Sequence, residues 1–128
     1  MKKLISFILC ACMIFLLCSC SKVSVDENAP VYLVYNYDDV SVNTKLTEAQ
    51  AQQVLSFLDK KMLFSDNPSC GFNEDISFQI DGKIYAPACD NCGIIKDCSS
   101  GKYINISQTE RDTVEEIFLA YGGHFPCV

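Results

Sequence analysis

Positive charge and histidine are scarce in this chain. Ten Lys and Arg residues stand against sixteen Asp and Glu residues, a net charge of −6, and the only histidine is His124. Nucleic-acid binding needs an excess of basic side chains to neutralise phosphates, so this balance argues against a nucleic-acid partner. The length of 128 residues excludes a multidomain enzyme. A hydrophobic content of 49% excludes disorder over most of the chain, because disordered segments are poor in apolar residues.

Catalytic motifs are missing as well. The sequence contains no GxGxxG, no P-loop and no HExxH pattern. A Ser/His or Cys/His nucleophile pair would have to use His124, which lies in a C-terminal tail where a general base is rarely held in place. The adjacent carboxylates of Glu115 and Glu116 diverge on a helix and form no obvious acid/base couple. We therefore expect no enzyme activity, no catalytic residue and no cofactor.

The N-terminus carries the pattern of an export signal. Lys2 and Lys3 precede the run 4–18, in which only Ser6 is polar. This run is shorter than the roughly 20 residues of a membrane span, and it fits the apolar region of a secretory signal. An uncleaved N-terminal anchor is the alternative interpretation, and both place the rest of the chain outside the cytoplasm.

The end of this run, LCSC at 17–20, resembles the lipobox of bacterial lipoproteins. The resemblance implies that Cys20 receives a diacylglyceryl thioether and that a signal peptidase cuts just before it. The chain then divides into a signal peptide (1–19), a lipid-anchored tether (20–30) and a single domain (31–128). The resemblance also implies a location on the extracytoplasmic side of the cell membrane. The part beyond the signal is similar to small uncharacterised bacterial lipoproteins.

Removal of the signal makes the remainder more acidic. Loss of Lys2 and Lys3 leaves eight basic residues against sixteen acidic ones in 21–128, a net charge of −8. Such a charge repels anionic lipid headgroups. The ten residues 21–30 of the tether reach at most about 35 Å. The sequence therefore predicts a domain held away from the bilayer.

Hydrophobic periodicity predicts the strands. The β-branched and aromatic segment Val31–Tyr37 is the clearest strand, with apolar residues on both faces. Alternating segments at 76–80 and 83–86 flank Asp81-Gly82, a hairpin turn that needs positive φ at both central residues. Further extended segments are expected at 40–43 and 103–106.

Two amphipathic helices are expected at 46–62 and 107–121. Each opens with a capping box, in which a hydroxyl residue is followed three positions later by Gln or Glu: Thr47 with Gln50, and Ser107 with Glu110. Residues 87–101 are rich in Cys, Gly and Ser and are expected to form a loop. The predicted fold is α+β, with two helices packed on a small, mainly antiparallel sheet in the order β-α-β-β-β-α.

Five cysteines follow Cys20, and an exported domain meets an oxidising environment. We expect Cys98, in a Ser/Gly loop, to be the odd thiol. A bond between Cys70 and Cys127 would close a loop of about 58 residues and contribute roughly 4 kcal/mol. Other pairings remain open. The candidates for disulfide formation are Cys70, Cys89, Cys92 and Cys127.

Metal binding is the alternative use of these cysteines. Cys89-x-x-Cys92 and His124-x-x-Cys127 have the spacing of two ligand pairs of a zinc site. A redox-active CxxC is disfavoured, because no helix follows it and Asp90 between the thiols raises their pKa. The rival to a disulfide-bonded module is therefore a metal- or thiol-handling lipoprotein that uses Cys89, Cys92, His124 and Cys127.

Tyrosines concentrate in the predicted strands: Tyr32, Tyr35, Tyr37 and Tyr85. They either pack in the core or form an exposed aromatic patch for a partner. Combining these observations, we expect a membrane-anchored, non-catalytic interaction or ligand-binding module with an unidentified protein or small-molecule partner.

Overall fold

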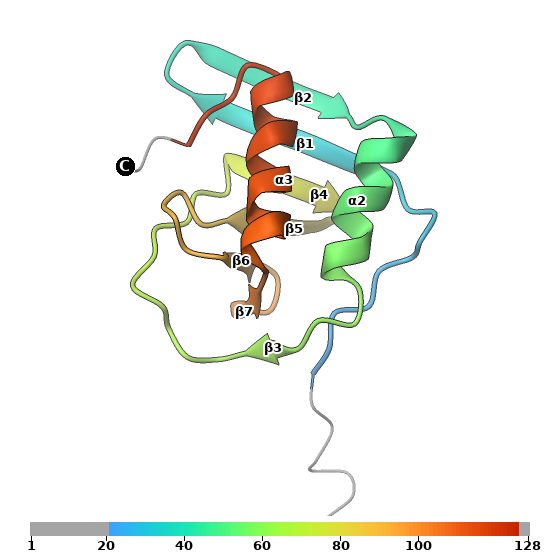
Figure 1. Ribbon diagram of the computed structural model, residues 1–128, viewed down its shortest axis with the longest axis vertical. Coiled ribbons are helices and arrows are strands. Elements are labelled where there is room, and N and C mark those ends of the chain that lie inside the picture. The colour runs from blue at the N-terminus through green and yellow to red at the C-terminus, as the bar shows by residue number, and fades with distance from the viewer. Residues whose placement is uncertain (1–20, 126–128) are drawn as a thin grey trace, which may run out of the picture.

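The computed structural model describes residues 21–125. The expectations for Cys20 and Cys127 lie outside these residues. Two helices and one antiparallel sheet of seven strands make up the described chain, so the α+β class is confirmed. Both helices lie over the same face of the sheet (Figure 1). Within residues 21–125, no helix has the length and apolar character needed to cross a membrane.

The sheet has the strand order β2-β1-β4-β5-β6-β7-β3. The element bounds, in chain order, are β1 Val31–Tyr37, β2 Val40–Lys45, α2 Glu48–Leu58, β3 Leu63–Phe64, β4 Ile76–Ile80, β5 Lys83–Pro87, β6 Ile94–Asp97, β7 Lys102–Asn105 and α3 Gln108–Ala120. Strand β1 lies between β2 and β4, which agrees with its apolar character on both faces.

The predicted order β-α-β-β-β-α lacks three of the observed strands. Strand β2 matches the expected extended segment, but β3 and β6 were not predicted. Strand β6 lies inside 87–101, where a loop was expected, because Ile94 and Ile95 pair with β7 and β5 on either side. Four residues are too few to show an alternation of apolar and polar side chains. Pairing with β5 and β7 therefore decides that this segment is a strand.

The hydrophobic core lies between the sheet and the helices. Alternate residues of β1 and β4 point into it and are almost fully buried: Val31, Leu33, Tyr35, Ile76, Phe78 and Ile80. The helices contribute Val54, Leu58, Val114, Ile117 and Phe118 to the same cluster. Two segments far apart in the sequence, α2 and α3, therefore share one apolar layer.

Both predicted capping boxes are present. The Thr47 and Ser107 side chains accept the backbone N–H of Gln50 and Glu110, and the reciprocal bonds also form. Helix α2 ends at Leu58 rather than at residue 62 as expected. The chain turns at Lys60, whose φ of 62° is left-handed, and then pairs with residues 21–23.

Candidate functional site

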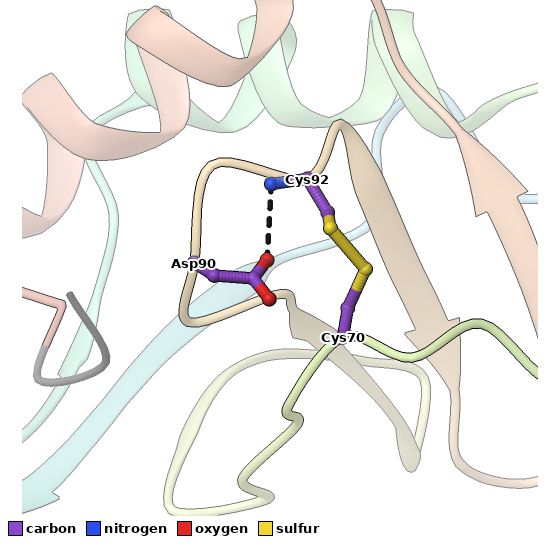
Figure 2. Close-up of side chains that lie close together, drawn as sticks. All are labelled: Cys70, Asp90 and Cys92. Atoms are coloured by element: carbon purple, nitrogen blue, oxygen red, sulfur yellow. Dashed lines mark hydrogen bonds between the residues drawn. A yellow bond between two sulfur atoms is a disulfide. The ribbon is translucent and has the colours of Figure 1, made fainter.

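Two loops on neighbouring parts of the sheet are joined by a disulfide between Cys70 and Cys92 (Figure 2). Cys70 precedes β4, and Cys92 lies in the connection between β5 and β6. Their Cα atoms are 6.4 Å apart, within the range of protein disulfides. Both residues were disulfide candidates. The expected pairing of Cys70 with Cys127 is wrong, because Cys70 is bonded to Cys92.

Asp90 shapes the turn that presents Cys92. Its Oδ1 atom accepts the backbone N–H of Cys92 at 3.0 Å, an Asx-turn that fixes the loop locally (Figure 2). The choice of Cys92 over its neighbour Cys89 follows from the fold. Both cysteines lie beside the loop of Cys70, since the Cys89 N–H donates to Gly71 O at 2.9 Å. Cys89 is buried in the core, however, and it is the Cys92 sulfur that bonds Cys70.

The zinc set expected from spacing is not assembled among residues 21–125. The Cys92 sulfur is covalently bound to Cys70, so it is not available as a thiolate. Within the described chain, one group of three possible ligand residues has its ligand atoms within 4.8 Å of one another: Cys70, Asp90 and Cys92. Cys89 and His124 instead line a separate cavity. Cys127 lies outside the described residues.

This cavity lies between α3, the β5–β6 connection and the segment that follows α3. Its volume is about 180 Å³. For comparison, an engineered apolar cavity of about 150 Å³ in another protein holds benzene. The lining combines apolar and polar side chains: Cys89, Asn91, Arg111, Glu115, Leu119, His124 and Phe125. It therefore has the size and the mixed character of a site for a small amphipathic molecule.

Arg111 is the unusual residue of this cavity. It is the only arginine of the chain and is 2% exposed. Its Nη2 atom donates to Asp90 O at 2.8 Å and pairs with Glu115 Oε1 at 3.1 Å. The Phe125 ring lies over the guanidinium, 4.4 Å from Cζ to the ring centroid.

Two guanidinium nitrogens of Arg111 are unsatisfied among residues 21–125. Within the part of the chain that the structure describes, Nε and Nη1 are buried and have no hydrogen-bond partner. An unsatisfied buried donor costs about 1–3 kcal/mol, and more for a charged group. Such a cost is uncommon in a folded protein and marks the guanidinium as a candidate binding group.

The segment that carries His124 and Phe125 is held by Tyr35 of β1. The Tyr35 hydroxyl donates to His124 O at 2.6 Å and accepts the His124 N–H at 3.2 Å. Gly123 lies against the Tyr35 ring, where a Cβ atom would come within 2.8 Å of Cδ2. The backbone of His124 is therefore fixed, while its imidazole lies at the exposed rim of the cavity.

Arg111 was not among the site residues expected from the sequence, although a signal was present. Arg111 stands three and seven residues before Val114 and Phe118, on the apolar stripe of α3. An arginine at a core-facing position needs a partner or a function. The residues that surround it come from distant segments, and no local pattern could identify them.

The tyrosines divide between the two expected roles. Tyr35 and Tyr85 are buried in the core, whereas Tyr32 and Tyr37 are partly exposed. Tyr32 and Tyr37 are five residues apart on β1 and so point to opposite faces of the sheet. The four side chains do not form one aromatic patch.

Cys98, the expected odd thiol, lies just after β6, is half-buried and forms no disulfide with another described residue. Burial, and then the charge of Glu74, raises the pKa of this thiol. A raised pKa lowers the thiolate fraction at neutral pH and makes the group a poor nucleophile.

No family model, no curated protein and no solved structure matches this chain.

Proposed function

We propose that this chain is an extracytoplasmic lipoprotein, anchored to the membrane through diacylglycerol on Cys20, whose α+β domain binds a small ligand without catalysis. The lipobox-like sequence at 17–20 supports the anchor. The Cys70–Cys92 disulfide supports an oxidising location, because disulfides persist outside the cytoplasm. The cavity beside α3 supports ligand binding.

The observation that carries ligand binding is the buried Arg111, two of whose nitrogens have no hydrogen-bond partner in the described part of the chain. Guanidinium donors bind carboxylates and phosphates, often with two hydrogen bonds. Glu115, already paired with Nη2, repels a doubly charged anion more than a singly charged one. Leu119 and Phe125 offer apolar contacts. The favoured ligand is a small monocarboxylate with an apolar body.

Access to Arg111 requires a local movement. Nε and Nη1 do not reach solvent, and the Phe125 ring covers the guanidinium. A bound carboxylate would take the place of this ring. Loss of the cation–π contact costs about 0.5–2 kcal/mol, and a hydrogen bond from the charged guanidinium to the carboxylate contributes about 1.5–3 kcal/mol.

Nuclear magnetic resonance tests the ligand. Because the chain has one arginine, the Nε–H resonance of Arg111 is unambiguous in ¹⁵N-labelled full-length protein in detergent micelles. Benzoate should shift this resonance, and the neutral isostere benzamide should not. A Phe125→Ala variant should bind benzoate at least threefold more tightly, because no ring has to be displaced. Absence of any shift in both wild type and this variant would reject the carboxylate site.

Metabolic labelling with radioactive palmitate tests the anchor. The wild-type chain and the matched control Cys18→Ala should both incorporate label and remain in the membrane fraction after an alkaline carbonate wash. Cys20→Ala should lose the label. Labelling that persists in Cys20→Ala would show that the lipid is not attached where the lipobox resemblance implies.

One observation favours metal handling as a second candidate function. The disulfide holds the sulfurs of Cys70 and Cys92 together, and a carboxylate oxygen of Asp90 lies within 4.8 Å of them. Once a phosphine has reduced the disulfide, two thiols and a carboxylate could bind zinc, each thiol losing its proton. Zinc binding by the reduced chain, weakened by Asp90→Asn and absent from the oxidised chain, would support this function. No binding after reduction would exclude it.

A further inference from the structure

The first residues that the structure describes are fixed to the domain. The Ser21 carbonyl accepts the N–H of Leu63 at 2.9 Å. Val23 is buried, its N–H donates to Lys61 O at 2.8 Å, and its carbonyl accepts the N–H of Lys60 at 2.9 Å. Figure 1 shows this segment entering beside the connection between α2 and β3. Three consecutive residues are thus held by the domain.

This arrangement shortens the expected tether. Cys20 is joined to Ser21 by one peptide bond, and neighbouring Cα atoms are about 3.8 Å apart. Any membrane attachment through Cys20, or through the apolar run before it, therefore brings Ser21 to within several ångströms of the headgroups. The reach of about 35 Å expected for a free tether does not apply, because residues 21–23 do not act as a spacer.

Three lysines lie where the chain enters the domain, although the chain as a whole is acidic. The Lys102 Nζ atom donates to Ser21 Oγ at 3.2 Å, and the exposed Lys22 forms a β-bridge with Met62. Lys60 is exposed beside them. Among the described residues, none of these three lysines forms an ion pair.

The opposing charges at this end of the molecule are few. Glu110 is paired with Lys61 at 3.1 Å, so these two charges compensate each other. Asp59 lies next to Lys60 and is partly buried, with its Oδ1 atom 3.5 Å from the Val25 nitrogen. Asp97 lies opposite Lys102 in the β6–β7 register, is 5% exposed and forms no ion pair among the described residues. The three lysines outnumber these two carboxylates, Asp59 and Asp97.

We propose that this surface, defined by Lys22, Lys60, Met62 and Lys102 and called the lysine pole, rests on anionic phospholipid headgroups. The inference relies on the membrane attachment proposed above. Lysines near an anionic bilayer are attracted to it, each contributing roughly a fivefold gain in apparent affinity. Met62 is 57% exposed and supplies an apolar side chain at the same contact. The rest of the acidic domain then faces away from the lipid.

Lysine accessibility in the wild-type protein tests this orientation. The membrane-derived protein is placed in nanodiscs of phosphatidylcholine alone or with phosphatidylglycerol, and its amines are labelled with an impermeant acylating reagent. Peptide mass spectrometry should show at least threefold slower labelling of Lys22, Lys60 and Lys102 in the anionic discs. Lys45 and Lys83, both exposed on strands elsewhere, should react equally in the two compositions. High salt should abolish the difference.

Charge reversal provides the second test. Lys22→Glu combined with Lys60→Glu should abolish the protection of Lys102 in anionic discs. The matched double variant Lys45→Glu and Lys83→Glu should retain it. Both pairs are exposed and carry the same change of charge, so unfolding does not explain a difference between them.

Failure of the docking surface and failure of the anchor give different results. Equal labelling of the pole lysines in both discs, for a protein that carries palmitate and stays with the membrane, would overturn the lysine pole alone. A protein without palmitate that leaves the membrane in the carbonate wash would overturn the anchor, and with it the premise of the lysine pole.

Discussion

At the residue scale, Tyr85 shows how the fold sets a chemical property that the sequence does not display. It is 1% exposed on β5 and pairs in register with Asp97 of β6. Burial, followed by the charges of Asp97 and Asp81, raises the pKa of Tyr85 to about 12. Asp97 lies in a segment for which a loop was expected. Its effect on the pKa of Tyr85 therefore depends on the pairing of β5 with β6.

This shift makes stability sensitive to alkaline pH. The unfolded tyrosine ionises near pH 10, whereas the folded one keeps its proton to about pH 12. Stability is therefore unaffected below pH 10 and falls as pH rises through this window, by about 1 kcal/mol at pH 11. Urea unfolding at pH 9 and pH 11 should show a smaller loss for Tyr85→Phe than for wild type. An identical loss in both would contradict the raised pKa.

Gly123 is the second residue whose identity depends on a tertiary contact. A Cβ atom there would come within 2.8 Å of the Tyr35 ring. We expect Gly123→Ala to destabilise the protein by about 2 kcal/mol through overpacking. Gly101→Ala, where φ is 71° and the space is open, should cost only about 1 kcal/mol of backbone strain. Thermal unfolding distinguishes them, and an equal or smaller effect of Gly123→Ala would exclude the overpacking.

At the element scale, the helix starts were predictable because capping chemistry is local. Both capping boxes form where the sequence placed them. The end of α2 was not predictable, since it depends on pairing between residues 60–63 and 21–23. Strands β3 and β6 were missed for the same reason: each is short and is defined by its partner strands.

Helix α3 provides the prediction at this scale. Ser107→Ala should cost about 1 kcal/mol, because the Glu110 N–H loses its acceptor. Glu116→Ala, an exposed change in the same helix, is the control and should alter stability by less than about 0.5 kcal/mol. Urea denaturation monitored by circular dichroism measures both. Equal values for the two variants would show that the cap does not stabilise α3.

The capping box of α3 also has a pH dependence. Burial opposes ionisation of Glu110, but the Ser107 N–H and the Lys61 ammonium outweigh it and lower the pKa of this carboxyl. Its contribution is present above the ordinary carboxyl pKa and is lost as pH falls through the lowered one. Glu110→Ala removes this carboxylate, so the stability that it costs in urea denaturation should be smaller at acid pH than at neutral pH.

At the scale of the whole molecule, the disulfide joins the β3–β4 connection to the β5–β6 connection, which are separated in sequence by β4 and β5. The bonded cysteines are 22 residues apart in sequence, which by chain entropy corresponds to about 3 kcal/mol. The double variant Cys70→Ser and Cys92→Ser should lose about this amount in urea denaturation. Cys98→Ser, at a cysteine outside any disulfide, should lose less than about 1 kcal/mol. A double variant as stable as wild type would show that the bond adds no stability.

The sequence by itself determined the α+β class, the central strand, the hairpin at Asp81-Gly82 and both helix starts, because periodicity, turn chemistry and capping act over a few residues. Only the tertiary structure decided that Cys92 bonds Cys70, that Arg111 lies buried in a cavity and that three lysines surround the entry of the chain. Each of these depends on segments brought together by the core and the sheet. Spacing along the chain carries no information about such contacts.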